Sequence, residues 1–227
     1  MVHSYQSKLH VICSHRNWFR TSAEQVIAVA ALAVMILPIA LTALVTKCTL
    51  GSPVLFRQQR VGMGMQNFMI LKFRTMRDTR DSEGKLLPDR QRETSFSRFL
   101  RKIRVDEFPQ LLAIADGKMS FVGPRPLLPE TIRFMGQLGM MRCRIRPGLT
   151  GWAQVNGNTK LSDSQKLSLD IWYIDNCSLA LDMSILFKTL LTLLLGERVD
   201  QSNLAEASQY VKLHYGSLKY PEASPEP

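Results

Sequence analysis

The chain has 227 residues, 45% of them hydrophobic, which suffices for one domain with a core and some appendages. Its net charge of +10 indicates an acidic partner, such as a nucleotide, an anionic membrane surface or nucleic acid. The four cysteines lack CxxC spacing and indicate neither a zinc site nor a disulfide framework. No helix-turn-helix, RRM or KH signature supports a nucleic-acid binder.

Residues 1–20 form a polar and basic leader, after which the chain becomes strongly apolar. Residues 26–45 carry no charge, and twenty such residues are long enough to cross a bilayer. The run is too long and too far inside the chain for a signal peptide, so we expect a retained membrane anchor within residues 21–50. Both flanks are basic, and the positive-inside rule therefore gives no orientation.

Pro38 lies near the middle of this anchor. A central proline removes one backbone hydrogen-bond donor and kinks a helix. A break at Pro38 would allow the segment to enter one leaflet and return to the same face as a re-entrant helix. The apolar run taken alone favours a plain bitopic helix.

Two short strands, predicted at residues 54–56 and 67–73, form a hairpin through the glycine-containing segment RVGMGM. Lys72 and Arg74 close the second strand, where they either bind phosphate or form a solvated basic edge. The charged residues between 77 and 92 predict a mobile loop near the entrance of a site.

The stretch from residue 96 to residue 126 places two adjacent carboxylates after a basic helix. The apolar residues of that helix recur with helical spacing at Phe96, Phe99, Leu100 and Ile103. This spacing predicts a helix that buries one apolar stripe and turns its arginines, Arg101 among them, outward.

Asp106 stands where the N-cap of the next helix belongs, with Pro109 in its first turn and Gly117 as its stop. The apolar face of this helix is predicted at Leu111, Leu112 and Ile114. The positive end of the helix dipole stabilises an ionised carboxylate and a bound phosphate. An ionised Asp106 can be a nucleophile, and with Glu107 it can hold a hard divalent cation. A plain cap beside a dipole partner is the alternative.

Rigid turns follow the acidic pair. The GPRP turn at residues 123–126 fixes the backbone around Arg125, whose planar fork matches phosphate oxygens. An exposed turn arginine is the alternative. Two further rigid turns follow, Arg146-Pro147-Gly148 with one cation and Thr150-Gly151-Trp152 with one large ring. Both side chains could contact a nucleotide or a lipid headgroup, although Trp152 could equally belong to the core.

The remainder of the chain is predicted to be helical. Residues 179–195 are apolar but carry Asp182 and Lys188, which favours an amphipathic interfacial or packed helix over a second membrane span. The apolar pattern fades after Gly196, so residues 199–227 are predicted to be a C-terminal tail with a disordered end. The chain as a whole is predicted to be α+β and predominantly helical.

Several long motifs occur in one order and spacing that resembles a known family. They are KFRTM at residues 72–76, VDEFPQLL at 105–112, MSFVGPRPLLPE at 119–130, RIRPGLTGWAQVNG at 144–157 and LDIWYIDN at 169–176. Together they resemble the bacterial sugar transferases, the monotopic polyprenyl-phosphate phosphoglycosyl transferases, from about residue 20 to residue 199. A set of long motifs is far more specific than one short motif.

The resemblance implies an enzyme that transfers a sugar 1-phosphate from a UDP-sugar to polyprenyl (undecaprenyl) phosphate. This reaction initiates an exopolysaccharide, capsule, O-antigen or glycoprotein glycan. The resemblance also implies a single N-terminal re-entrant membrane helix at residues 21–50 between a cytoplasmic leader at 1–20 and a cytoplasmic catalytic domain at 51–198, on the bacterial inner membrane. A non-catalytic membrane scaffold of a polysaccharide assembly complex is the alternative function, and turnover distinguishes the two.

The family mechanism assigns roles to individual residues. Asp106 attacks the sugar-linked phosphorus, releases UMP and forms a covalent phosphosugar, while Glu107, with Asp106 beside it, holds Mg²⁺. The predicted substrate-binding residues are Lys72, Arg74, Arg101, Arg125, Arg146, Asp170 and Asp182, all but Arg74 and Arg146 from the family pattern. The expected partners are UDP-sugar, polyprenyl phosphate, anionic inner-membrane lipids and downstream glycosyltransferases.

The chain departs from the family pattern at a few positions. Family members often have Ser-Pro at the break of the membrane helix, where this chain has Leu37-Pro38. At the start of that helix they often have an acid after two basic residues, where this chain has Glu24-Gln25. Lys118 replaces an acid, and Asn158 replaces an arginine. The last two substitutions alter local charge, and we expect them to change sugar choice, regulation or activity.

Overall fold

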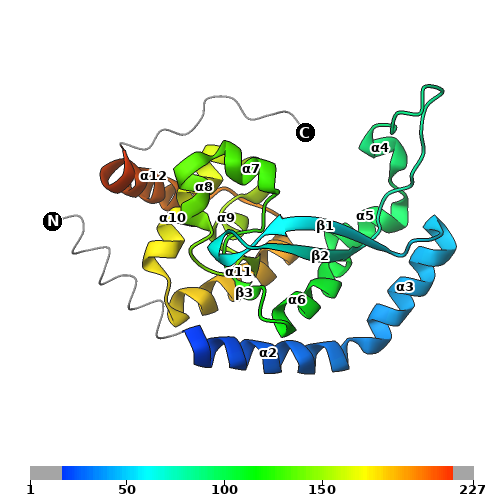
Figure 1. Cartoon of the computed structure of the whole chain (residues 1–227), viewed down its shortest axis with the longest axis horizontal. Helices are drawn as coiled ribbons and strands as arrows, with labels where there is room; N and C mark the ends of the chain where they lie inside the picture. Colours follow the sequence, from blue (N-terminus) through cyan, green and yellow to red (C-terminus); the bar gives the residue numbers. More distant parts are fainter. Residues whose placement is uncertain (1–16, 217–227) are drawn as a thin grey trace.

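The computed structural model describes residues 17–216 and is mostly helical, with two small sheets (Figure 1). The predicted leader up to residue 16 and the tail beyond residue 216 lie outside the described residues. The longer helices are α2 (Asn17–Val34), α3 (Ile36–Leu50), α5 (Ser95–Lys102), α10 (Asp163–Asn176), α11 (Leu179–Leu195) and α12 (Gln201–Tyr215). The shorter helices are α4 (Asp89–Arg92), α6 (Leu111–Ala115), α7 (Pro129–Phe134), α8 (Gly136–Arg142) and α9 (Trp152–Val155). Short 3-10 helices are η1 (Met63–Met65), η2 (Val105–Gln110) and η3 (Asn158–Lys160).

Helices α2 and α3 form a bent pair along one side of the molecule (Figure 1). Their axes differ by 61°. By length and apolar composition, no single helix in residues 17–216 qualifies as a membrane span, whereas the pair taken together does. The predicted single helix is therefore two helices.

The break falls at Met35, three residues before the predicted Pro38. Pro38 occupies the first turn of α3, where proline is tolerated. In a continuous helix it would offer no N–H to the carbonyl of Val34, and its ring would clash with that carbonyl. The helix therefore ends one turn ahead of the proline rather than at it.

The first sheet is the predicted hairpin, with β1 (Leu55–Val61) antiparallel to β2 (Asn67–Phe73). Strand β2 matches its predicted bounds, and β1 extends five residues beyond residue 56. Phe68 and Ile70 face inward from β2 and pack with Ala28 of α2 and Ile114 of α6. One wall of the domain therefore consists of the hairpin, α2 and α6.

The second sheet pairs β3 (Ser120–Val122) in parallel with β4 (Gly148–Thr150). Its strands approach so closely that only glycine fits. A Cβ at Gly148 would lie 2.1 Å from the amide nitrogen of Gly123, and one at Gly151 would lie 2.1 Å from the Gly123 carbonyl oxygen. The two glycine-containing turns thus hold each other, and this contact fixes the backbone that leads into Arg125.

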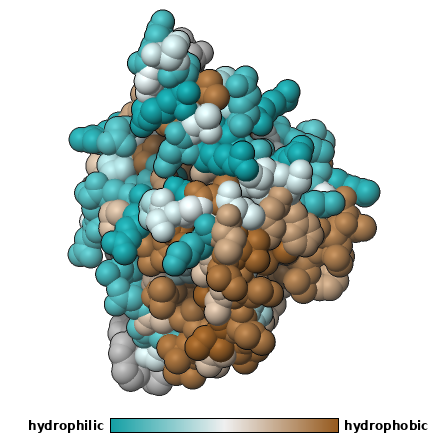
Figure 2. Space-filling model, turned by 90° about the vertical axis from the view of Figure 1, so that its right-hand side faces the viewer, coloured by the Kyte–Doolittle hydropathy of each residue, from teal (hydrophilic) through white to brown (hydrophobic). Residues whose placement is uncertain are grey.

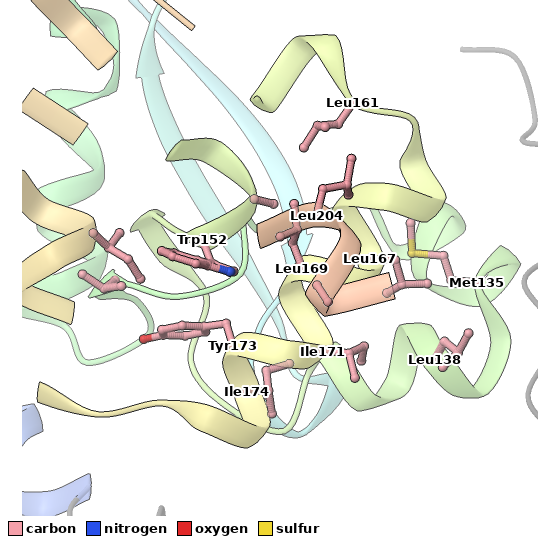
Figure 3. Packing of buried hydrophobic residues seen from close by; sticks show 14 residues of the cluster. Met135, Leu138, Trp152, Leu161, Leu167, Leu169, Ile171, Tyr173, Ile174 and Leu204 are labelled. Atoms are coloured by element: carbon pink, nitrogen blue, oxygen red, sulfur yellow. The ribbon is translucent and has the colours of Figure 1, made fainter. Parts of the chain in front are cut away.

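The main core lies among α8, α9, α10, α11 and α12 (Figure 3). Trp152, Leu169 and Tyr173 are almost completely buried there, which confirms the core interpretation of Trp152. Leu204 and Ala207 of α12 complete this cluster. Residues 201–215 of the predicted tail therefore form a helix that packs on the domain.

Two predicted helical faces in the middle of the chain are only partly confirmed. Within α5, Leu100 is buried but Phe99 is 56% exposed, and Ile103, just after the helix, is 40% exposed. The short helix instead turns Ser97, with its hydroxyl beside the N-cap Thr94, toward the protein interior. Within α6, Leu112 is exposed while Leu111 and Ile114 are buried. Gly117, in the left-handed region, ends this helix as predicted.

Asp106 is not an N-cap. It lies inside the first turn of η2, whose N-terminal flanking residue is Arg104 in the left-handed conformation, with no side-chain cap. A 3-10 start is compatible with Pro109, because the N–H that proline lacks is not needed in the first turn. The acids therefore remain at a helix N-terminus, as predicted, but as members of its first turn.

Candidate active site

A cavity of about 610 Å³ opens between the hairpin, α5, η2 and the turn after β3. It brings together most of the predicted site residues, namely Lys72, Arg74, Arg101, Asp106, Glu107 and Arg125. These residues come from three separate stretches of the sequence, namely residues 72–74, 101–107 and 125. The cavity is therefore a candidate active site that is assembled by the fold rather than by one motif.

Glu107 is the electrostatic centre of this cavity. Its Oε1 atom accepts from Lys72 Nζ at 2.8 Å and from Arg125 Nη2 at 2.7 Å, while Oε2 lies 3.6 Å from Arg104 Nη1. Burial alone would raise the pKa of Glu107, but the charges of Arg125 and Lys72 lower the pKa to about 2. Glu107 is therefore ionised at any physiological pH and fixes two cations in place.

Asp106 has the opposite situation. Within residues 17–216 its carboxylate takes part in no hydrogen bond or ion pair, although the residue is only 8% exposed and lines the cavity. Burial raises the pKa of Asp106, and the neighbouring charge of Glu107 raises the pKa further. A buried carboxylate without partners is costly, so its retention beside a cationic pocket indicates a chemical role.

The backbone of Arg125 is held by a buried ion pair that lies outside the cavity. Its carbonyl accepts from Arg142 Nη2 at 2.9 Å, and the same guanidinium binds Asp170 Oδ2 at 2.6 Å. Arg142 and Asp170 are both buried. Asp170 does not line the cavity, and its internal ion pair favours a supporting role over the predicted contact with substrate.

Arg74 and Arg101 line the cavity but bind protein groups. Arg74 Nη1 donates to the Ser52 carbonyl at 3.3 Å, and its Nη2 donates to the Leu50 carbonyl at the end of α3. Arg101 pairs with Glu93. Arg74 therefore ties the C-terminus of α3 to the hairpin, while Arg101, 43% exposed at its side chain, stays accessible from the cavity.

Arg146 and Asp182 lie in a second cavity of about 650 Å³, which is mostly apolar and lies between α2 and α11. Arg146 Nη2 binds Glu24 Oε2 at 3.0 Å, and Asp182 Oδ2 lies 2.7 Å from Arg20 Nη1. The structure thus does not bring these two predicted residues to Asp106. Their ion pairs instead fasten the start of α2 to the domain.

Several cavity residues were not predicted as site residues. They are Arg60, Arg92, Arg104, Asn158, Thr159 and Glu197, among others. Arg60 is the most informative, because its Nε is buried without a hydrogen-bond partner among the described residues. Burial and the neighbouring Arg125 lower the pKa of Arg60. The strand pattern of the sequence does not reveal which basic residues, such as Arg60, face a cavity. Among these six residues, only Asn158 stands out in the sequence, as a departure from the family pattern.

The described residues offer few metal ligands. Within residues 17–216, no group of three or more His, Cys, Asp or Glu side chains is placed to hold a metal ion. Two groups of the acidic pair could bind a metal ion. One is the carboxylate of Asp106, which has no partner among the described residues, and the other is the Oε2 atom of Glu107, whose Arg104 partner is 3.6 Å away. This set is too small for a metal site built from protein ligands alone. It fits Mg²⁺ that is also bound by substrate phosphates.

Comparison with known proteins identifies the family of the chain. The sequence pattern of the family described as bacterial sugar transferase matches residues 15–196. The chain is 44% identical over 169 residues to the "Uncharacterized sugar transferase EpsL" of Bacillus subtilis (strain 168), covering 74% of this chain and 84% of that protein.

Two further relatives carry names that state a reaction. One is the UDP-N-acetylgalactosamine-undecaprenyl-phosphate N-acetylgalactosaminephosphotransferase of Aeromonas hydrophila, 39% identical over 68% of this chain and 38% of that protein. The other is the undecaprenyl-phosphate glucose phosphotransferase of Komagataeibacter xylinus, 39% identical over 66% of this chain and 31% of that protein. The chain thus spans about a third of the length of these two proteins. The family match over residues 15–196 shows that the chain belongs to the bacterial sugar transferases.

Proposed function

We propose that the protein transfers a sugar 1-phosphate from a UDP-sugar to polyprenyl phosphate, and that undecaprenyl phosphate is the acceptor. The proposal includes a covalent intermediate on Asp106. An Asp106 carboxylate oxygen attacks the phosphorus that bears the sugar, the bond from that phosphorus to the bridging oxygen breaks, and UMP leaves. An oxygen of the polyprenyl phosphate then attacks the same phosphorus and displaces Asp106. The product is a polyprenyl diphosphate sugar, which starts a glycan.

The observation that carries this proposal is the contrast between the two acids. Glu107 is held by Lys72 and Arg125, whereas the described residues leave the carboxylate of Asp106 without partners in the same cavity. A nucleophile must be free to attack, and cations beside it must be able to stabilise charge on the transferring group. Of the two acids, only Asp106 satisfies the first requirement.

Mg²⁺ is the proposed cofactor. Asp106 and Glu107 would hold it together with the diphosphate of the donor, and the ion would neutralise charge on that diphosphate. The two carboxylates lie side by side, and the charge of Glu107 raises the pKa of Asp106. A bound cation relieves this repulsion.

The proposed location is the cytoplasmic face of the bacterial inner membrane. The acceptor is a lipid, and α2, α3 and α11 expose large apolar residues such as Leu37, Phe187 and Leu194. Figure 2 faces the side that carries α3 and displays a broad hydrophobic area below the hydrophilic loops. A contiguous exposed apolar area marks a contact site for protein or membrane, and it fits contact with lipid.

The test is the covalent intermediate itself. Purified wild-type protein is incubated with Mg²⁺ and a UDP-sugar without any acceptor, and intact-protein and peptide masses are measured together with UMP. We expect UMP release and the added mass of one phosphosugar on the peptide that contains Asp106. Asp106→Asn should give neither, because it lacks the attacking anion. Asp116→Asn, an exposed acid outside the cavity, is the matched control and should behave as wild type.

The outcomes separate the alternatives. Normal turnover by Asp106→Asn eliminates Asp106 as nucleophile. Turnover without an adduct in a rapidly quenched reaction favours direct displacement in a ternary complex. No turnover with any UDP-sugar and acceptor favours a non-catalytic scaffold. Glu107→Gln should weaken activity, and higher Mg²⁺ should relieve part of the loss if this side chain helps to hold the ion.

A further inference from the structure

One rim of the active-site cavity is made of three hydrogen-bonded polar side chains. Many of the lining side chains are cations, whereas Asn158, Thr159 and Glu197 contribute an amide, a hydroxyl and a carboxylate at one place. Glu197 Oε1 accepts from the Asn158 amide, and Oε2 accepts from the Thr159 hydroxyl and from the Thr159 backbone N–H at 3.2 Å. We call these three side chains the polar rim.

The polar rim is held rigidly from outside the cavity. Lys160 Nζ donates to the Glu197 carbonyl oxygen at 2.7 Å, which joins η3 to the segment after α11. Gly157 has a φ of 143° and packs directly against Leu161 and Val199, so this turn admits no larger residue without strain. Fixed polar groups of this kind can discriminate between ligands, because a mismatched ligand leaves them unpaired.

The polar rim retains free hydrogen-bonding capacity. A carboxylate offers about four acceptor positions, and the described contacts use three of those on Glu197. The side-chain oxygen of Asn158 and its second N–H have no partner among the described residues. Acceptors and a donor at fixed positions match neighbouring hydroxyl groups and do not match a phosphate, which needs donors only.

The polar rim shares its cavity with the proposed nucleophile. Arg104 lies 3.6 Å from Glu107 Oε2 and lines the cavity together with Asp106 and Glu197. The acidic pair and the polar rim therefore face the same space. In an in-line displacement the leaving UMP points away from the attacking oxygen, so the group beside the nucleophile is the sugar on the attacked phosphorus.

We propose that Asn158, Thr159 and Glu197 bind the hydroxyl groups of the transferred hexose and set which UDP-sugar is used. This inference rests on the proposed function, because it assumes a UDP-sugar donor attacked by Asp106. It assigns sugar choice to a rim formed by two separate segments, η3 and the residues after α11. Asn158 itself is one of the positions at which the chain departs from the family pattern.

The experiment compares sugar preference with nucleotide binding. UMP release is measured for UDP-glucose, UDP-galactose and their N-acetyl forms with wild type, Glu197→Gln and Asn158→Gly. Glycine suits position 158, where φ is 45°, so this change removes the amide without backbone strain. Inhibition by UMP, which lacks the sugar, is measured in parallel. Lys166→Met, which loses only an exposed pair with Asp163 and does not line the cavity, is the matched control for loss of a local contact.

We expect kcat/KM for the preferred sugar to fall roughly 10- to 100-fold in Glu197→Gln and Asn158→Gly, as for loss of hydrogen bonds to a charged or buried group. The ratio between sugars should change, while the inhibition constant of UMP stays within about twofold and Lys166→Met keeps the wild-type ratio. Unchanged preference in both variants overturns the inference and leaves the proposed function intact. Weaker UMP binding in both variants overturns it too, because the rim then binds the nucleotide or supports the fold. A wild type that releases UMP from none of the sugars overturns the proposed function and this inference together.

Discussion

Asp106 and Glu107 are adjacent in the chain but have opposite electrostatic surroundings. Burial opposes ionisation of both, yet Arg125 and Lys72 reverse this effect for Glu107 and bring its pKa to about 2. The corresponding cations near Asp106 are outweighed by burial and by Glu107, so the pKa of Asp106 is raised. Glu107 is stabilised as a carboxylate by its cations, whereas ionisation of Asp106 is disfavoured.

The first prediction is that Asp106→Asn makes the protein inactive and more stable. A carboxyl whose pKa is raised in the folded state binds its proton more tightly there than in the unfolded chain. Its ionised form therefore reduces stability at neutral pH, and asparagine removes that penalty. The melting temperature should rise, by roughly 2–4 °C for each kcal/mol gained in a protein of this size.

The pH dependence checks the sign of this effect. The gap between variant and wild type should be largest above the folded-state pKa of Asp106. It should shrink as the pH falls and vanish below the ordinary value of 3.8, where wild-type Asp106 is protonated in both states. Thermal unfolding in detergent between pH 3 and pH 8 measures the gap. A variant that is less stable than wild type at pH 8 would show that ionised Asp106 is stabilised by groups other than those described.

The second prediction concerns Arg125. Arg125→Lys keeps the positive charge but loses the planar fork, of which one nitrogen binds Glu107 and the other nitrogens remain for phosphate oxygens. The folded state should persist, and kcat should fall on the order of 100-fold, as for removal of one donor to a developing charge. Steady-state kinetics with a melting curve on the same sample measures both. Wild-type kcat in the variant removes Arg125 from the group that stabilises the transition state.

At the scale of elements, local sequence patterns predicted what depends on neighbours in the chain. Strand β2 and helix α11 have the bounds expected from their patterns, and Gly117 ends α6 because only a few residues adopt its left-handed conformation readily. Six of the nine predicted site residues line one cavity because their motifs come from segments that the fold brings together. The patterns alone did not show which residues would meet.

The failures share one physical cause, which is long-range packing. Phe99 and Leu112 fit a helical stripe, but their helices have only eight and five residues and pack through other side chains. The sequence after Gly196 looks weakly apolar, yet Leu204 and Ala207 suffice to dock α12 on α10. Arg146, Asp170 and Asp182 have side chains that could bind a substrate. In the folded protein, however, each forms an ion pair with another residue of the chain. Charge type in a motif does not reveal which partner the fold supplies.

The third prediction tests the support behind Arg125. Arg142 and Asp170 form a buried pair, and removing one charge leaves the other buried without compensation, which costs about 3–5 kcal/mol. Asp170→Asn should therefore lower the melting temperature by roughly 6–20 °C. Asp163→Asn on the same helix α10 breaks only an exposed pair with Lys166 and should cost less than about 1 kcal/mol.

A double variant distinguishes stability from positioning. Arg142→Met with Asp170→Leu replaces the pair by apolar groups, which is often neutral for stability. It still removes the donor to the Arg125 carbonyl, so we expect stability to return while kcat stays low. If kcat returns together with stability, the pair acts only on folding and does not position Arg125.

At the scale of the whole molecule, both ends of the α2–α3 pair are attached to the same domain. At the start of α2, Glu24 accepts from Ser120 Oγ at 2.8 Å and pairs with Arg146, and Gln25 donates to the Ala115 carbonyl. At the end of α3, Arg74 binds the carbonyls of Leu50 and Ser52. The pair therefore leaves the domain and returns to it.

The lengths of the two limbs agree with this path. The apolar part of α2 after residue 25 has nine residues, and that of α3 before Lys47 has eleven, so each limb is about 14–17 Å long at 1.5 Å per residue. Each limb reaches about half of the roughly 30 Å hydrocarbon core. A bend of 61° between two such limbs fits entry into one leaflet better than passage through both.

The last prediction is that the two flanks of the pair lie on the same, cytoplasmic side of the membrane. Cysteines introduced singly at Arg16 and at Arg57 are treated with a membrane-impermeant thiol reagent on intact cells and on inverted vesicles. Labelling is read on separate peptides, so that the native cysteines do not interfere. We expect both sites to react only in inverted vesicles, because the contacts of Glu24 and Arg74 hold both flanks on one domain. Labelling of either site from the periplasmic side would establish a bitopic helix.

Pro38→Leu removes the constraint that separates α2 from α3. If that proline maintains the re-entrant path, a fraction of this variant should expose one flank to the periplasm, and activity should fall by the same fraction.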